Sequence, residues 1–192
     1  DIYRHDYEEY VTGSTSTKVT ANSTATTLFD STFYVLTSDR NVYKCLDNDG
    51  NTASTVEPTG TSTSVITTGD GYKWKYMYTL SAAQQSNFLS TDFMAVATNS
   101  TVSSAATDGG IDIVKIKTAG SSYTVSGGGT SGTITNVPIR GDGSSAVCSV
   151  TLTSGAITAV TITTNGSGYT SGYIRNADII AATNAGGAGS GA

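Results

Sequence analysis

Apolar and polar residues alternate most clearly over residues 69–80, where an acidic-glycine turn leads straight into a predicted strand. Side chains of a strand point alternately to its two faces, so this stretch predicts one aromatic face and one mixed face. The aromatic face consists of Tyr72, Trp74, Tyr76 and Tyr78, and the other face of Lys73, Lys75, Met77 and Thr79. An aromatic row is typical of a β core, and a stacking surface for sugar or nucleic acid is the alternative.

Shorter patterns flank this strand. Residues 33–36 and 42–46 are apolar runs separated by a polar turn, which predicts a hairpin. A hydroxyl-rich connector over 52–68 follows. After the aromatic strand, Ser81 and Gln84 fit a capping box, which predicts a helix over 82–89. We expect this to be the only helix, held to the core by Phe88 and Leu89, and we expect another strand over 93–97.

The second half contains an internal repeat. Residues 111–124 recur as 157–170, with eight of fourteen positions identical at a spacing of 46 residues. Each copy is predicted to be an alternating strand followed by a Gly-Ser-x-Tyr turn, and Ser154-Gly155 predicts a hairpin between 146–152 and 157–163. In the turns, glycine supplies a positive φ and tyrosine folds back over the apolar face. The residues expected in these roles are Gly120, Tyr123, Gly166 and Tyr169.

These patterns together predict a mainly β protein with two parts. Residues 1–98 are expected to form an antiparallel β domain with one short helix, followed by a linker over 99–110. Residues 111–183 are expected to form a repeated β-hairpin module of sandwich or prism-like form. Residues 184–192 resemble a flexible Gly-rich linker or tail, which suggests a piece of a longer polypeptide.

Charge and cysteine content narrow the class of partner. The net charge is −5 and only 13% of the residues are charged. The acidic excess lies before residue 99, so the clustered basic residues that nucleic acid requires are missing. Apolar runs are too short to span a membrane, so no membrane partner is expected either. Cys45 and Cys148 are far apart and form no motif, which favours free thiols in a reducing environment.

Catalytic and cofactor chemistry is not indicated. His5 is the only histidine, which leaves no partner for a zinc site or a catalytic triad. Asp47, Asp49 and Gly50 resemble the start of a calcium loop, but the glycine comes too early and Pro58 occupies the twelfth position, so a plain turn is favoured. The glycines of 127–132 precede a predicted strand and not the helix that a phosphate site requires. We therefore expect no enzyme activity and no cofactor.

Three sequence blocks resemble one family. They are Val42-Tyr43-Lys44-Cys45-Leu46-Asp47, Ser54-Thr55-Val56-Glu57-Pro58-Thr59-Gly60 and Gly69-Asp70-Gly71-Tyr72-Lys73-Trp74-Lys75-Tyr76. The family is the baseplate wedge subunit (the gene-product-eight family) of T-even-like contractile-tail phages, and the similarity covers roughly residues 1–98. The resemblance implies a virion protein, assembled in the host cytoplasm, that pairs with itself and docks on other baseplate wedge and tail proteins without catalysis. The structural or assembly candidates it marks are Tyr43, Cys45, Gly71, Tyr72, Trp74 and Tyr76.

The second half resembles a different group, the Gly-Ser-x-Tyr β repeats of phage virion proteins, over residues 111–183. The expected function is therefore a structural part of a phage tail baseplate. The alternative is a carbohydrate- or receptor-binding module of a tail fibre or adhesin. In that case Tyr123, Tyr169 and Tyr173 would stack on sugars, and Asp142 or Asp178 would supply hydrogen bonds.

Overall fold

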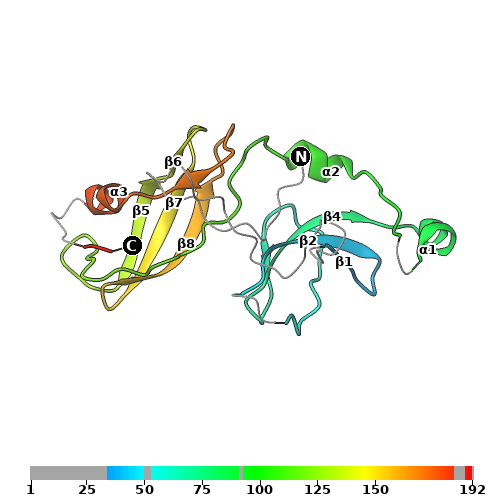
Figure 1. Ribbon diagram of the computed structural model, residues 1–192, viewed down its shortest axis with the longest axis horizontal. Helices are drawn as coiled ribbons and strands as arrows, with labels where there is room; N and C mark the ends of the chain where they lie inside the picture. The colour runs from blue at the N-terminus through cyan, green and yellow to red at the C-terminus, as the bar shows by residue number, and fades with distance from the viewer. Residues whose placement is uncertain (1–33, 50–52, 91–92, 184–188, 192) are drawn as a thin grey trace, which may run out of the picture. The chain divides into compact units, whose positions relative to one another are not determined.

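The computed structural model describes residues 34–49, 53–90, 93–183 and 189–191, and it divides into two compact units (Figure 1). The first unit is Asp1–Ala105 and the second is Ala106–Ala192, so the division lies within the predicted linker. Antiparallel sheets with a few short helices make up both units, which confirms the mainly β prediction. The expectations for 1–33 and for most of the predicted tail lie outside the described residues.

A four-stranded antiparallel sheet forms the centre of the first unit. Its strands, in the spatial order β1-β2-β4-β3, are β1 (Tyr34–Leu36), β2 (Asn41–Asp47), β4 (Lys73–Thr79) and β3 (Ile66–Thr67). The predicted hairpin is confirmed, since β1 and β2 pair antiparallel with Val35 opposite Tyr43. The aromatic strand β4 lies between β2 and β3 and pairs antiparallel with both.

The aromatic residues of β4 are buried, but they do not share one cluster. Tyr72, Trp74 and Tyr76 pack with residues of β2, whereas Tyr78 packs with Val42 in a separate cluster. The pairing of β2 with β4 shifts register between Val42, which lies opposite Tyr78, and Tyr43, which lies opposite Tyr76. A register shift of this kind inserts an extra residue and changes the face on which the following side chains lie. The prediction of a single aromatic face is therefore wrong for Tyr78.

Helix α1 (Ala82–Phe88) begins as the sequence predicts. Gln84 donates its backbone N–H to Ser81 Oγ at 3.2 Å, and the Ser81 N–H donates to Gln84 Oε1 at 2.9 Å, which completes the capping box. The predicted anchoring to the core is wrong, because Phe88 is 61% exposed and Leu89 40% exposed. Alanine, glutamine, serine and asparagine fill the rest of the helix, so it has no apolar stripe to bury.

The chain after α1 also differs from the prediction. Residues 93–97 form no strand; the Tyr78 hydroxyl donates to the Ala95 carbonyl, and Met94 packs near it. Helix α2 (Ser100–Ala105) then lies in the predicted linker, with the Asn99 side chain accepting from the Val102 N–H at 3.0 Å. The prediction of a single helix is thus wrong, and so is the strand over 93–97.

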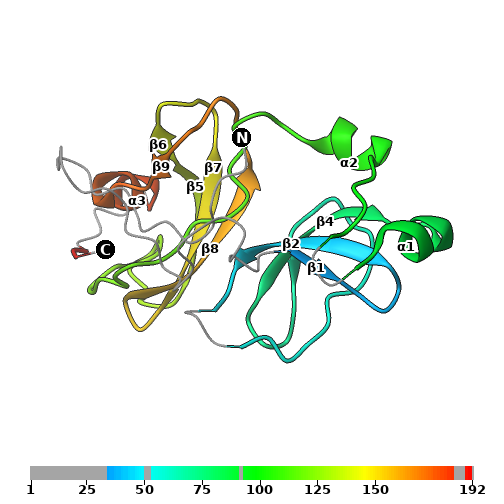
Figure 2. The same ribbon diagram turned by 45° about the vertical axis from the view of Figure 1, so that its right-hand side comes forward.

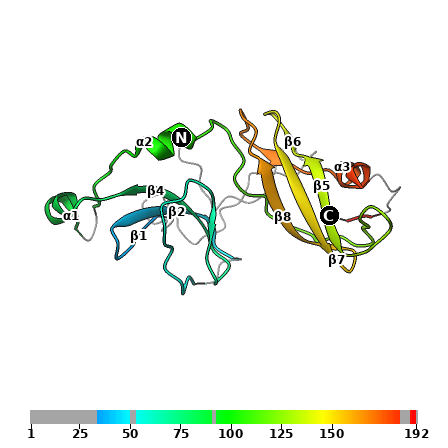
Figure 3. The ribbon, with the colours of Figure 1, turned by 180° about the vertical axis from the view of Figure 1, so that it is seen from behind.

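The second unit contains two small sheets and one helix. Strands β5 (Gly132–Pro138), β7 (Val147–Thr153) and β8 (Ala156–Thr164) form an antiparallel sheet in that order (Figure 3). Strands β6 (Arg140–Gly141) and β9 (Gly172–Tyr173) pair separately, and α3 (Asn176–Ala182) packs beside β5 (Figure 2). The hairpin turn predicted at Ser154-Gly155 is confirmed, since both residues have positive φ and join β7 to β8.

The two copies of the repeat do not adopt the same secondary structure. The second copy supplies strand β8, but residues 111–118 of the first copy form no strand in the described part of the chain. The prediction of a strand in the first copy is wrong, and a repeated hairpin module is not confirmed. Helix α3 was also not predicted, although Asn176-Ala-Asp-Ile-Ile-Ala-Ala182 is rich in helix formers and carries an acid in its first turn.

The burial of Trp74 predicts a large loss of stability on truncation. We expect Trp74→Ala to lower the free energy of unfolding of the first unit by about 3–5 kcal/mol, because it leaves a cavity among three buried aromatic rings. Phe93→Ala is the matched control, since Phe93 is 74% exposed, and it should change stability by less than about 0.5 kcal/mol. Calorimetric unfolding of the full chain measures both. Equal stability of the two variants would show that the aromatic row is not a core.

Candidate functional site

The candidate residues fall into two groups, one in each unit. In the first unit, two pairs of aromatic rings are in contact across and along β4. Tyr43 and Tyr76 meet edge-on with ring centroids 5.8 Å apart, and Tyr72 stacks on Trp74 at 5.3 Å. Cys45 packs in the same cluster. The structure therefore brings together five of the six predicted residues, with Gly71 in the turn before them.

The polar atoms of these rings are satisfied within the unit. The Tyr43 hydroxyl donates to the Gly60 carbonyl at 2.6 Å, which fastens the long connector to β2. Trp74 Nε1 donates to Thr68 Oγ1 at 3.3 Å, and the Tyr76 hydroxyl pairs with Thr79 Oγ1 at 2.7 Å. Buried rings with satisfied polar ends form a core and not a stacking platform for a ligand.

Asp70 organises the connector, although the sequence analysis did not single it out. Its Oδ2 accepts from the Ser54 hydroxyl at 2.8 Å and from the backbone N–H groups of Thr55 and Val56 at 2.8 and 3.0 Å. Its Oδ1 accepts from the Thr68 hydroxyl. Donation from Thr68, then from Ser54 and the two amides, holds the pKa of Asp70 well below its usual range. The segment that Asp70 binds is thus the beginning of the second sequence block, residues 54–60.

Gly71 and Cys45 have structural explanations. Gly71 has φ +86°, and a Cβ there would lie 2.6 Å from the Asp49 side chain, so only glycine fits this turn. Burial raises the pKa of the Cys45 thiol to about 11, which keeps it protonated near neutral pH. The Asp49 N–H donates to Asp47 Oδ1 at 3.2 Å, an arrangement typical of the turn that we favoured over a calcium loop.

The tyrosine turns of the second unit form the other group. Gly120 and Gly166 have φ of 61° and 65°, and the following tyrosines are 1% and 6% exposed. Tyr123 and Tyr169 belong to one core cluster, as the fold-back prediction requires. The Tyr169 hydroxyl donates to the Ile139 carbonyl at 3.0 Å, and the Tyr123 hydroxyl donates to Asn176 Oδ1 at 2.5 Å. Neither ring face is available to stack on a sugar.

Hydrogen bonds link the two copies of the repeat in pairs, and the two bonds of a pair join positions that correspond at the 46-residue spacing. Ile111 N–H donates to the Asn165 carbonyl at 2.8 Å, and Ile157 N–H donates to the Ala119 carbonyl at 2.8 Å. Adding 46 to the first donor gives the second donor, and subtracting 46 from the first acceptor gives the second acceptor. The same holds for two further bonds at 3.0 Å, Tyr123 N–H to Gly155 O and Tyr169 N–H to Gly109 O. Each copy therefore binds the other reciprocally.

Two glycines that the sequence analysis missed complete these turns. A Cβ on Gly143 would lie 2.4 Å from the Tyr169 ring, and a Cβ on Gly189 would lie 2.2 Å from the Tyr123 ring. The residue after each glycine bridges the same turn: Ser144 pairs antiparallel with Ser167, and Ser190 with Ser121. The signal was present in the sequence, because Gly143-Ser144 recurs 46 residues later as Gly189-Ser190.

The acids proposed for sugar binding also have internal partners. Asp142 accepts from the Thr170 hydroxyl and from the Thr170 and Ser171 amides at 3.0 and 3.1 Å, which lowers its pKa to about 2. Asp178 is buried and forms ion pairs with Arg175 and Arg140, each at 2.8 Å. These contacts hold the pKa of Asp178 well below its usual range.

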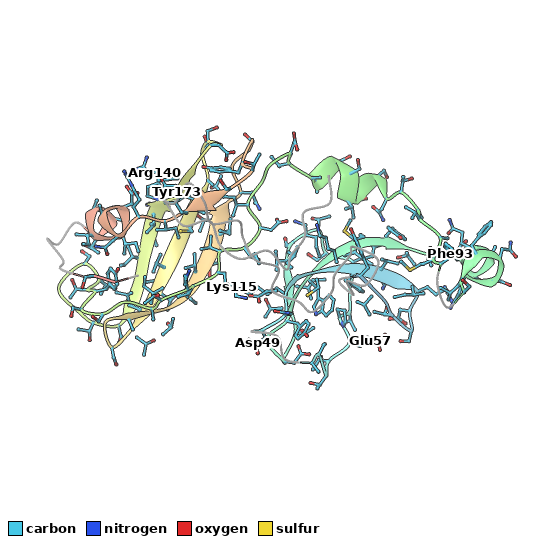
Figure 4. The ribbon with its side chains drawn as sticks, in the orientation of Figure 1. Asp49, Glu57, Phe93, Lys115, Arg140 and Tyr173 are labelled. Carbon is cyan, nitrogen blue, oxygen red and sulfur yellow. The ribbon has the colours of Figure 1, made fainter. Side chains whose placement is uncertain are left out.

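Tyr173 is the one half-buried tyrosine of the proposed sugar-binding set, and it lies beside Arg140 on the β6–β9 pair (Figure 4). One half-buried ring without free acids gives a sugar no enclosing site.

Comparison with known proteins leaves the chain without a match to any family model, curated protein or solved structure. Among the described residues, no group of three or more histidine, cysteine, aspartate or glutamate side chains could hold a metal ion. The described helices also include none long and apolar enough to cross a membrane.

The close packing of Gly143 against Tyr169 predicts a steric cost for any side chain there. We expect Gly143→Ala to destabilise the second unit by about 1–3 kcal/mol, because the added methyl group must displace a buried ring. Gly69→Ala is the control: its Cβ would meet nothing within 4 Å, so stability should change by less than about 0.5 kcal/mol. Urea unfolding followed by circular dichroism compares the two. A neutral Gly143→Ala would contradict the proposed packing.

Asp178 predicts an acid-sensitive component of stability. Its pKa is depressed in the folded state, so its contribution is fully present above the unfolded value of about 4 and is lost as the pH falls below it. Asp178→Asn should cost about 1–3 kcal/mol at pH 7 and reduce the loss of stability between pH 4 and pH 2. Urea titrations at several pH values measure this. Asp108→Asn removes an exposed aspartate of the same unit and controls for the change in net charge.

Proposed function

We propose that this protein is a structural component of a phage tail baseplate, similar to a wedge subunit, and that it acts by assembling with other proteins. Its partners are other baseplate wedge and tail proteins, together with a second copy of itself as a dimer. The sequence blocks of the first unit support the baseplate assignment, and an exposed apolar segment supports assembly as the mode of action.

That exposed segment is the observation that carries the proposal. Helix α1 ends, and the following chain continues, with large apolar side chains directed away from both clusters of the first unit. Phe88 is 61% exposed, Phe93 74% and Val96 83%, with Leu89 between them in the sequence. Phe93 lies beside α1 (Figure 4). Several large apolar side chains exposed within nine residues are typical of a protein–protein contact.

The internal use of the polar chemistry supports a structural role. The carboxylates of Asp70 and Glu57 both bind loop segments to the sheet; Glu57 Oε1 accepts from the Ser38 N–H at 2.6 Å and from its hydroxyl at 2.9 Å. The aromatic hydroxyls and the buried thiols are likewise held inside the units. These groups stabilise loops that would otherwise be free to move, which suits a subunit that must present a fixed shape to its neighbours.

The sheet edges offer a second kind of contact. Strands β1 and β3 are short edge strands of the first sheet, and short edges favour docking by side chains over uncontrolled strand pairing. The weakly charged, hydroxyl-rich composition also lowers the cost of removing water from a large contact surface.

A double substitution in the exposed segment tests the proposal. Phe93→Ser with Val96→Ser should leave the thermal midpoint unchanged, because neither side chain belongs to a core cluster. The variant should be incorporated into phage tails at least about tenfold less than the wild type, as expected when apolar anchors of an interface are removed. Quantitative mass spectrometry of purified tails assembled in infected cells measures incorporation.

Val56→Ser is the matched control for this experiment. Val56 is an exposed apolar residue of the same unit, 40% exposed, but it lies in the connector and outside the 88–96 segment. Its variant should be incorporated like the wild type. Absence of the wild-type protein from purified tails would refute the baseplate assignment, whereas normal incorporation of the double variant would refute the role of the exposed segment alone.

A further inference from the structure

Two arginines and a tyrosine share the outer face of the β6–β9 pair. Arg140 in β6 lies directly opposite Tyr173 in β9, and residues opposite each other in an antiparallel pair have their side chains on the same face. Figure 4 shows these two side chains next to each other. Arg175 follows Tyr173 by two residues and has extended backbone angles, so its side chain lies on that face as well.

The neighbouring isoleucines fix the direction of these side chains. Ile139, which precedes Arg140, is 4% exposed and belongs to the core cluster of the second unit. Ile174, which lies between Tyr173 and Arg175, packs against the same cluster. Alternation therefore directs both isoleucines inward and the three polar side chains outward. Both arginines are exposed, and the tyrosine is half-buried.

A single buried carboxylate holds the two guanidinium groups. Asp178 Oδ2 accepts from Nε of Arg140 at 3.1 Å and from Nε of Arg175 at 2.8 Å. Asp178 Oδ1 accepts from the Nη2 groups of the same two arginines, at 2.8 and 3.0 Å. These hydrogen bonds raise the pKa of both guanidinium groups, and the nearby Tyr173 raises it further. One carboxylate thus orients both arginines but balances only one of their two positive charges.

The same face keeps hydrogen-bond donors that no described residue uses. Each guanidinium binds Asp178 through Nε and Nη2, which leaves its Nη1 group without a partner in the described part of the chain. The Tyr173 hydroxyl likewise has no partner among the described residues. Asp142, the nearest acid to Arg140 in the sequence, instead accepts from the amides of 170–171. The two Nη1 groups, the hydroxyl and one unbalanced positive charge are therefore left over.

We propose that Arg140, Arg175 and Tyr173 form a binding site for a small oxyanion, a phosphate or a carboxylate. The anion lies on the side of the guanidinium groups away from Asp178, where the Nη1 groups and the hydroxyl donate to its oxygens. Arginine suits this role because its planar guanidinium stays charged and matches the geometry of carboxylate and phosphate oxygens. Asp178 already orients both long side chains, so anion binding requires little further ordering. This inference concerns the second unit and does not depend on the proposed function.

Nuclear magnetic resonance of the full chain tests the proposal, with sodium phosphate as the probe. The nitrogen–proton signals of the arginine Nε–H groups and of the amides 140–142 and 172–175 are followed during titration at neutral pH. Sodium chloride keeps the ionic strength constant and serves as the reference, because general screening acts on every surface charge. A second titration with sodium acetate distinguishes a carboxylate ligand from a phosphate. At least one of the two oxyanions should give saturable shifts confined to these residues, whereas chloride should not.

Three substitutions decide whether the shifts come from this site. Tyr173→Phe removes only the hydroxyl and should weaken binding of the anion at least about twofold. Arg140→Gln removes one of the two charges and should weaken binding at least about fivefold, while Asp178 keeps its contacts with Arg175. Arg40→Gln is the matched control, since it removes an exposed arginine of the first unit, and it should bind like the wild type.

Two results would overturn the proposal. The first is that phosphate and acetate shift the signals no more than chloride does, or without saturation. The second is that Tyr173→Phe and Arg140→Gln bind as tightly as the wild type, because the anion would then lie elsewhere. If Arg140→Gln does not fold, Tyr173→Phe decides the question alone, since its ring and its place on the strand are retained.

Discussion

Both units depend on burying tyrosine without leaving its hydroxyl unsatisfied. In the first unit, tyrosines and the one tryptophan supply much of the buried volume, and in the second unit two tyrosines join a mainly aliphatic core. A buried hydroxyl without a partner costs about 1–3 kcal/mol, so each ring must end at an acceptor. Tyr43 ends at the Gly60 carbonyl and Tyr169 at the Ile139 carbonyl, and both contacts join segments far apart in the sequence. The core residues thereby also fix the loops.

The carboxylates extend the same arrangement at the surface. Asp70 accepts from two hydroxyls and two amides of the connector before it, and Asp142 binds Thr170 and Ser171 in a similar way. In both cases an acid at a turn replaces the backbone partners that a loop lacks. This explains how so much irregular chain keeps a defined course between short strands. It also leaves these acids occupied, which argues against ligand binding through them.

Local patterns were predictable from the sequence, and long-range choices were not. Alternation identified β4 and the β1–β2 hairpin, and the Ser81–Gln84 pair identified α1, because these signals depend on residues close in the chain. The change of face at Tyr78 depends on a register shift with β2, which no single strand encodes. Phe88 and Leu89 were misplaced for a similar reason: their apolar character was clear, but the sequence does not say whether a core lies beside them. The contacts of the candidate residues could not be read from the sequence. Asp70 was recognisable only once its partners were known, whereas Gly143 could have been found from its recurrence as Gly189.

The unequal copies of the repeat show why sequence identity did not ensure equal secondary structure. Positions 111 and 157, 114 and 160, and 116 and 162 carry the same residues and face the same core, yet only the second set lies in a strand. A strand is defined by its neighbour's backbone as much as by its own side chains, so strand patterning alone does not ensure that a segment forms a strand. The turns behave differently because their determinants are internal: Gly120 and Gly166 supply the positive φ, and the tyrosine that follows each one closes the turn within the copy pair. The repeat therefore gives the same turn in both copies, whereas the formation of a strand depends on the backbone that pairs with it.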